Sequence, residues 1–190
     1  MNRSAAIAAL SPVGTHRFKL VAIGCVLAVL YAGKHYYSAA SAADLDWILA
    51  PTAHLVSFVG GHHFTYEAGA GWVDRDVTFI IAPACAGVNF MLAAFMALTF
   101  GWLGTMLSWR ATARRLAIAA ALAYVATLIV NTIRIAIAIA MHRGTIDVGS
   151  LDHGEAHRIE GILIYLGGLC ALYAIARAAS ERSKTHALLR

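Results

Sequence analysis

The first segment of this chain that could do chemistry runs from Pro83 to Gly87, where a polar loop turns into a long apolar stretch. Pro83 suits the first turn of a helix, so Cys85 is expected near a helix N-terminus, where the positive end of the helix dipole favours a thiolate. The thiolate is the nucleophilic form of cysteine, and Ala86 and Gly87 leave space for a substrate. Asn89 falls one turn later on the same predicted face and could donate a hydrogen bond. The alternative is a quiet cysteine in a contact between small residues.

The second segment is a polar stripe inside an apolar run, formed by Thr127, Asn131 and Arg134 at positions i, i+4 and i+7. An arginine costs about 2.5 kcal/mol or more at the centre of a membrane span, and less near an interface. The stripe is therefore expected to face protein rather than lipid. The alternative is that Arg134 snorkels to lipid head groups, but snorkelling does not explain Asn131.

The third segment opens the last apolar stretch, with His157, Glu160 and Gly161 on one helical face. Imidazole is the side chain whose charge changes near neutral pH, and a neighbouring carboxylate such as Glu160 can orient it. Gly161 would let another helix or a substrate approach closely. The alternative for His157 is a solvated loop histidine.

The elements that must position these residues are apolar. The chain has 190 residues, of which 60% are hydrophobic and 13% charged, whereas soluble domains carry about 25% charged residues. A polytopic membrane protein in one domain, residues 1–190, is predicted. The basic residues do not interleave with aromatic residues, so nucleic acid is not an expected partner. Cys25 and Cys170 lie inside apolar runs and are expected to be small buried hydrophobic residues.

The predicted fold class is an all-α integral membrane bundle with about four full spans. The spans are predicted at residues 17–33, 84–109, 116–141 and 158–177, since a span needs roughly 20 apolar residues. The first could be a cleaved signal peptide, but a retained anchor is favoured. Residues 45–59 are apolar but short and contain Pro51, so they are interpreted as an interfacial or re-entrant helix. Residues 64–81 predict a small extracytoplasmic β-hairpin, with strands at 64–66 and 72–81.

Lysine and arginine concentrate in cytoplasmic loops, which sets the expected orientation. An N-terminus inside the cell puts ten basic residues inside and four outside, with Arg134 in a span. The inside group is Arg3, Arg17, Lys19, Arg110, Arg114, Arg115, Arg177, Arg182, Lys184 and Arg190, and the outside group is Lys34, Arg75, Arg143 and Arg158.

This orientation also predicts the depth of the three segments. Arg134 lies 18 residues beyond Leu116, or roughly 27 Å at about 1.5 Å per residue, close to the far edge of a core about 30 Å thick. Cys85 and His157 each lie at the outer end of a predicted span. A thiol, a guanidinium and an imidazole are therefore expected at one level, facing outward.

These segments together resemble the exosortase/archaeosortase family of membrane cysteine transpeptidases. The family pairs a cysteine followed by a small residue and glycine with an Asn-x-x-Arg element and a His-x-x-x-Gly element. Here the motifs are Cys85-Ala86-Gly87, Asn131-Thr132-Ile133-Arg134 and His157-Arg158-Ile159-Glu160-Gly161. The resemblance covers roughly residues 79–173 and is greatest to the compact exosortase K type. The chain departs from the pattern in having fewer spans than most members, and Ala86 where serine is common.

The resemblance implies Cys85 as nucleophile, His157 as general acid/base and Arg134 as the stabiliser of the thiolate or oxyanion, with no cofactor and no metal. It implies Asn131, Asn89, Glu160 and Gly161 as supporting or substrate-binding residues. The implied substrate is a membrane-tethered protein with a C-terminal signal made of a short motif such as Pro-Glu-Pro, an apolar helix and a basic tail. Cleavage would give a thioester, and transfer to an envelope acceptor would follow. The implied location is the bacterial inner membrane, with the active site facing the periplasm.

Two other functions stay open. A metal- or haem-binding membrane subunit would use histidines and carboxylates outside the spans, since His153 and His157 stand at i, i+4, a spacing that lets two histidines share a metal. The other expected ligands are His62, His63, His142, Asp152 and Glu155. The second alternative is a non-catalytic assembly protein of the envelope.

Overall fold

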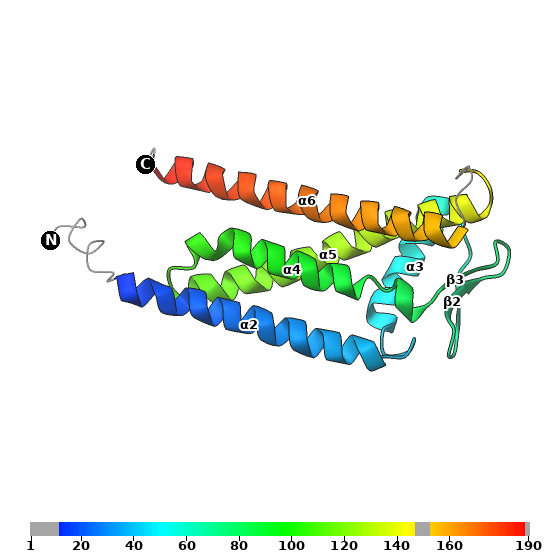
Figure 1. Ribbon diagram of the computed structural model, residues 1–190, viewed down its shortest axis with the longest axis horizontal. Helices are drawn as coiled ribbons and strands as arrows, with labels where there is room; N and C mark the ends of the chain where they lie inside the picture. The colour runs from blue at the N-terminus through cyan, green and yellow to red at the C-terminus, as the bar shows by residue number, and fades with distance from the viewer. Residues whose placement is uncertain (1–11, 147–152, 189–190) are drawn as a thin grey trace.

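The computed structural model describes residues 12–146 and 153–188, and it is an elongated helical bundle with a small sheet at one end (Figure 1). The helices are α2 (Pro12–Ala39), α3 (Asp46–Gly60), α4 (Val88–Trp102), α5 (Trp109–His142) and α6 (His153–Leu188), with 3₁₀ turns η1 (Pro83–Cys85) and η2 (Leu103–Thr105). The strands are β1 (Thr65–Glu67), β2 (Gly71–Asp74) and β3 (Phe79–Ile81). Arg3, Asp152 and Arg190 lie outside the described residues, as do the side chains of His153, Arg182 and Lys184.

Four helical segments of the described chain are long and apolar enough to cross a membrane. They are His16–Ala39, Pro83–Thr105, Trp109–His142 and Gly154–Ala179. Each contains most of one predicted span. Figure 1 shows the start of α2 and the end of α6 at one end of the bundle, and the α5–α6 connection at the other.

The helix α5 starts earlier than the predicted span at residue 116. Ser108 caps it, because its hydroxyl accepts a hydrogen bond from the Ala111 backbone N–H at 3.2 Å. Arg110, Arg114 and Arg115 therefore lie in the first turns of α5 rather than in a loop. Arginine is a good helix former, so the helix extends past the end of the apolar stretch.

The helix α4 packs against α2, α5 and α6, and α5 also packs against α3. Toward the sheet, one apolar core joins α3, α4 and α5 through residues such as Leu49, Leu92 and Ile135. A second core includes Ala119 and Ala123 of α5, whose small side chains let helices approach closely.

The segment predicted to be interfacial or re-entrant forms α3, a helix of 15 residues that crosses the end of the bundle (Figure 1). It is not among the four segments long enough to span a membrane. Tyr124 of α5 donates a hydrogen bond to the carbonyl of Trp47 at 3.0 Å. Trp72 of β2 donates its indole N–H to the Asp46 carboxylate at 2.9 Å. The helix α3 is thus tied to both the bundle and the sheet.

The sheet has three antiparallel strands in the order β1-β2-β3, so the predicted two-stranded hairpin is wrong in strand number. The predicted strand at 72–81 is interrupted by a turn between Asp74 and Phe79, in which Thr78 has a φ of 53°. The chain folds back there and pairs Trp72 with Ile81. The alternation of apolar and polar residues, from which one strand was predicted over residues 72–81, does not reveal that the chain reverses its direction within this segment.

Asp74 organises this turn. Its side chain accepts hydrogen bonds from the backbone N–H groups of His63, Asp76 and Val77 at 2.9–3.3 Å. Burial alone would raise the pKa of Asp74, which is 1% exposed, but these N–H groups and the nearby His62 outweigh it and hold the pKa below its ordinary value. The turn therefore depends on an ionised carboxylate.

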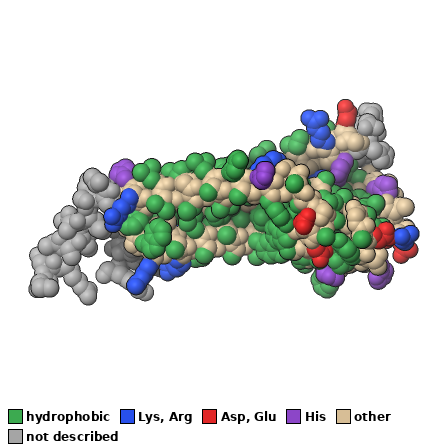
Figure 2. Space-filling model, turned by 90° about the horizontal axis from the view of Figure 1, so that it is seen from below, with side chains coloured by type: hydrophobic (Ala, Val, Ile, Leu, Met, Phe, Trp, Pro, Cys, Tyr) green, Lys and Arg blue, Asp and Glu red, His purple; other side chains and the backbone are tan. Residues whose placement is uncertain are grey.

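Charged side chains are distributed unequally along the bundle. On the face shown in Figure 2, lysine and arginine lie at both ends of the bundle, and the described side chains at the end where α2 starts and α6 ends include no acidic one. The acidic side chains and most of the histidines on that face lie at the end with the sheet. The two ends of the bundle therefore differ in charge, as they do in membrane proteins with a fixed orientation.

Candidate functional site

Arg134 of α5 and His157 of α6 are in direct contact. The guanidinium NH2 lies 3.1 Å from the His157 Nε2. Gly161, one turn after His157, makes room for this contact, because a Cβ there would lie 3.0 Å from the Arg134 Nε. The glycine of the His-x-x-x-Gly element thus has a steric reason to be a glycine.

This contact assigns the protonation of His157. A guanidinium has five donors and no acceptor, so Nε2 must be the acceptor in the pair. The imidazole in this arrangement is neutral, with its proton on Nδ1. Nδ1 faces the Glu160 Oε2 at 3.5 Å, so a carboxylate orients the ring from its other side.

Glu160 is a buried carboxylate, with a side chain that is 8% exposed. Its Oε2 lies 3.9 Å from the Arg134 Nε, which is too long for a hydrogen bond but close enough for charge compensation. Neither Glu160 oxygen nor the Arg134 Nε has a hydrogen-bond partner in the described part of the chain. Because leaving a charge buried and unpaired is costly, Glu160 and Arg134 stabilise each other here.

The polar stripe on α5 is buried, as predicted: Thr127 and Asn131 are both 0% exposed. Asn131 donates from Nδ2 to the backbone carbonyl of Cys85 at 2.6 Å. Its Oδ1 accepts a hydrogen bond from the Tyr165 hydroxyl at 2.8 Å. The same hydroxyl accepts from the Arg134 NH1 at 3.5 Å. A continuous set of contacts therefore connects Cys85 to His157.

Tyr165 is a site residue to which the sequence pattern assigns no role. It bridges Asn131 and Arg134, and its ring lies under the guanidinium, with Cζ 5.3 Å from the ring centroid. The signal that could have revealed it is spacing. Tyr165 follows Gly161 by four residues and His157 by eight, so all three share a face of α6.

Cys85 is half-buried. The expectation that it lies in the first turn of the long apolar helix is wrong. Cys85 ends the 3₁₀ turn η1, and α4 begins only at Val88. Gly87 separates them with a φ of 71°, a left-handed conformation that favours glycine. A Cβ on Gly87 would also lie 3.3 Å from the Asn131 Cγ. This glycine both turns the chain and lets it approach α5.

The interruption at Gly87 also changes the position of Asn89. The expected contact on one helical face with Cys85 required an unbroken helix. Asn89 is instead exposed and accepts a hydrogen bond from Lys34 of α2 at 3.1 Å. Tyr37 of α2 contacts the 3₁₀ turn that contains Cys85, because its hydroxyl donates to the carbonyl of Pro83 at 3.3 Å. Tyr37 is near enough to Cys85 and Arg134 to interact with both electrostatically.

The three predicted reactive groups are therefore brought together to different degrees. Arg134 and His157 touch, whereas Cys85 joins them through its backbone carbonyl. Among the interactions of the described residues, no hydrogen bond or ion pair joins the Cys85 sulfur to His157 or Arg134.

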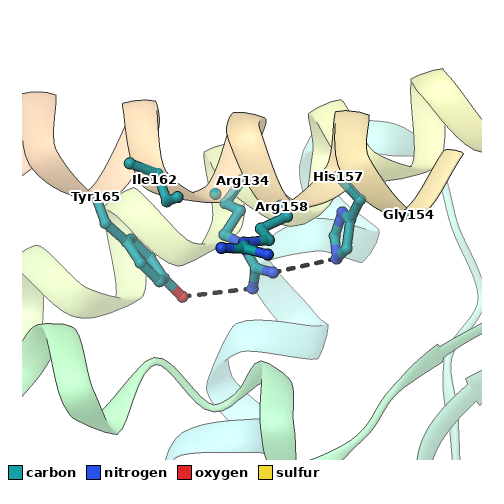
Figure 3. A pocket seen from close by; sticks show the side chains of 7 residues that line it. Arg134, Gly154, His157, Arg158, Ile162 and Tyr165 are labelled. Carbon is teal, nitrogen blue, oxygen red and sulfur yellow. Dashed lines mark hydrogen bonds between the residues drawn. The ribbon is translucent and has the colours of Figure 1, made fainter. Parts of the chain in front are cut away.

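A pocket of about 370 Å³ opens beside the Arg134–His157 contact (Figure 3). It is lined by Arg134, Gly154, His157, Arg158, Gly161, Ile162 and Tyr165. Its lining combines basic and aromatic side chains with two glycines and one isoleucine. It is large enough for a side chain of a substrate.

In the described residues, no three side chains of His, Cys, Asp or Glu come together as a possible metal site. His62, one of the ligands expected for a metal centre, lies 3.5 Å from Asp74 instead. His142 stacks edge-on against Phe79.

Comparisons of the chain with protein-family models, with curated proteins and with solved structures found no match. The chemistry of the site must therefore be argued from its own geometry.

Proposed function

We propose that this chain is a membrane-embedded cysteine peptidase or transpeptidase of the exosortase/archaeosortase kind. One observation carries the proposal: the Arg134–His157 contact belongs to the same hydrogen-bonded cluster that holds the carbonyl of Cys85. The three motifs come from three different elements, η1, α5 and α6. Their meeting in one cluster brings together the segments that carry a thiol, an imidazole and a guanidinium, the groups that acyl transfer through a cysteine would use, and this supports the proposal.

Each residue has one role in the proposed reaction. Cys85 is the nucleophile, His157 exchanges protons, and Arg134 stabilises negative charge on the sulfur or on the carbonyl oxygen. Glu160 orients the imidazole, as the third member does in other nucleophile–base–acid sets. Asn131 and Tyr165 position the backbone of Cys85 and the guanidinium of Arg134.

The proposed reaction has two halves. The thiol proton of Cys85 passes to the His157 Nε2, and the sulfur attacks the scissile carbonyl carbon. The C–N bond breaks, His157 gives its proton to the departing amine, and a thioester remains. An acceptor amine or water then attacks the thioester, its proton passes through His157 to the sulfur, and the free thiol returns.

This sequence requires one local rearrangement. The His157 Nε2 is occupied by Arg134 in the structure, and it must be released before it can take a proton. The guanidinium has an alternative hydrogen-bond partner in Glu160, because neither oxygen of this carboxylate has a hydrogen-bond partner in the described chain. We therefore propose that substrate binding moves Arg134 from His157 toward Glu160 and the developing oxyanion.

The proposed substrate is a secreted protein that carries its own C-terminal apolar helix, with a short motif before it and a basic tail after it. A substrate held in the bilayer presents its scissile bond at a fixed depth, which lowers the entropic cost of reaching Cys85. The proposed location is the bacterial inner membrane, with the site on the periplasmic side. The ten-to-four split of lysine and arginine between the two sides of the predicted spans supports this orientation.

The decisive experiment co-expresses the chain with a secreted reporter that ends in such a tripartite tail. Mass spectrometry of the reporter C-terminus is expected to show cleavage before the apolar helix with the wild-type chain and none with Cys85→Ala. Cys25 and Cys170, which were predicted to be buried, are both exposed on the surface of the bundle. The matched control is therefore Cys170→Ala, which removes an exposed thiol from α6 and should leave cleavage intact. Normal processing by the Cys85→Ala variant would reject the enzyme and favour an assembly protein. Loss of activity on chelation would favour a metal mechanism.

A further inference from the structure

The 3₁₀ turn η1, which carries Cys85, is held by hydrogen bonds from two different helices. At its start, the backbone carbonyl of Pro83 accepts a hydrogen bond from the Tyr37 hydroxyl of α2 at 3.3 Å. At its end, the carbonyl of Cys85 accepts one from Asn131 of α5 at 2.6 Å. A single 3₁₀ turn has poorer internal hydrogen-bond geometry than an α-helix, so its position depends on such contacts with its neighbours.

We propose that Tyr37 is a positioning residue for the nucleophile. Together with Asn131 it clamps η1 at both ends and thereby holds the Cys85 thiol toward the Arg134–His157 pair. The proposal rests on the proposed function and adds a residue of α2 to the elements that build the site. The three sequence motifs lie on η1, α5 and α6, so no motif indicates this role for α2.

Tyr37 is itself restrained by its neighbours. It is partly buried and packs against the same apolar core as Cys85. The ammonium of Lys34, which lies one turn earlier on α2, is 5.8 Å from the centroid of the Tyr37 ring. Lys34 also donates a hydrogen bond to the Asn89 side chain of α4 at 3.1 Å, so it ties the end of α2 to the helix that follows η1. The ring is therefore held beside the turn by both the core and Lys34.

A hydrogen bond to a backbone carbonyl suits a positioning role better than a role in proton transfer. A tyrosine hydroxyl has one proton, and in this arrangement Tyr37 donates it to Pro83 rather than to the reacting groups. The residue nevertheless lies close enough to Cys85 and Arg134 to interact with both electrostatically. Without this bond η1 could shift relative to α5, and a misplacement of about 1 Å can lower a rate by on the order of 10²-fold.

The first test measures cleavage of the tailed reporter by the full chain in proteoliposomes. Tyr37→Phe is expected to lower kcat by about tenfold to hundredfold with little change in KM, because the sulfur is misplaced while the surface that binds the substrate is kept. Lys34→Met should lower kcat by a smaller factor, because it weakens only a contact that restrains the ring. The matched control is Tyr31→Phe, which alters an exposed tyrosine of the same helix and should keep the wild-type kcat.

The second test examines the thiol without a substrate. Mass spectrometry follows the alkylation of Cys85 by N-ethylmaleimide and compares its rate with that of the exposed Cys170 in the same chain. Release of η1 exposes a half-buried thiol, so Tyr37→Phe and Asn131→Ala should each raise the ratio of the two rates. A rise of about three- to twentyfold is expected from the loss of one hydrogen bond in a membrane protein. Because both bonds hold the same turn, the double variant should exceed the larger single effect only slightly.

The outcomes separate the clamp from the proposed function. If Tyr37→Phe leaves both kcat and the alkylation ratio at their wild-type values, the clamp is rejected and the proposed function stands. A fall in kcat with an unchanged ratio also rejects the clamp and assigns the hydroxyl a direct contact with the reacting groups. An equal rise in the alkylation of Cys85 and Cys170 indicates a general loosening of the fold and rejects a specific role. If the wild-type chain cleaves no substrate, the proposed function fails, and the alkylation ratios alone decide whether Tyr37 holds the turn.

Discussion

The hydrogen bonds around Asn131 should contribute measurably to stability, and a double-mutant cycle can isolate them. Asn131→Ala removes the donor to the Cys85 carbonyl at 2.6 Å and the acceptor of the Tyr165 hydroxyl at 2.8 Å. Both bonds lie within candidate membrane spans, where a side-chain hydrogen bond contributes about 0.6–1.7 kcal/mol. The loss of two such bonds should destabilise the chain by about 1.2–3.4 kcal/mol. Tyr165→Phe removes the bond to Asn131 and the longer contact from the Arg134 NH1 at 3.5 Å, so it should cost between about 0.6 and 3.4 kcal/mol.

The two substitutions remove one shared bond, so their effects should not add. A coupling energy of about 0.6–1.7 kcal/mol is expected from the free energies of unfolding of the four variants, measured by detergent titration in bicelles. Tyr173→Phe provides the control, because Tyr173 is an exposed tyrosine on the same helix. Its effect should add to that of Asn131→Ala. Coupling within the additivity error of about 0.3–0.5 kcal/mol would refute the proposed bond between Asn131 and Tyr165.

Three further predictions concern single substitutions. Gly87→Ala should lower the free energy of unfolding by about 2–5 kcal/mol in the same assay, because the new side chain adds both left-handed backbone strain and close packing. The control Gly24→Ala should not destabilise the chain, because a Cβ at Gly24 would have no other atom within 4 Å. Gly161→Ala should displace the guanidinium of Arg134 and lower kcat by about 10²-fold. The control Gly167→Ala on the same helix should keep the wild-type kcat. Equal kcat values for the two variants would contradict the steric role of Gly161. Asp74 has a lowered pKa, so its stabilisation is present above the unfolded pKa of about 3.9 and is lost as the pH falls through the folded value. Asp74→Asn should abolish this acid-side loss in thermal melts between pH 7 and 3, and an unchanged profile would remove the carboxylate from the turn.

The sequence predicted the parts of the fold that depend on long, repeated patterns. Four apolar stretches predicted four helices. A stretch that lies in lipid or in a protein core has no water for its backbone groups, so these must form hydrogen bonds within the stretch, as they do in a helix. The stripe on α5 predicted a buried face, since Asn131 and Arg134 are costly in lipid. The sequence placed Arg134 and His157 at one depth, but their contact within the bundle is visible only in the structure.

The parts that the sequence did not predict depend on single residues. The helix break at Gly87 comes from one left-handed residue, which displaces Cys85 from α4 and Asn89 from Cys85. The reversal after Asp74 depends on one side chain that accepts three backbone N–H groups. Tyr165 looked like an ordinary aromatic residue of an apolar helix, because only the tertiary structure shows what its hydroxyl contacts.

The helix α5 explains why two of the motifs contain a glycine. Gly87 lies against Asn131, and Gly161 lies against Arg134, so each glycine lets a neighbouring segment approach one polar residue of the α5 stripe. A side chain at either position would push away the segment that carries Cys85 or His157. The polar stripe thus contacts both the segment that carries Cys85 and the helix that carries His157. On this geometry, the spacing of Asn131 and Arg134 on α5 sets the positions of the Cys85 backbone and the His157 ring relative to each other.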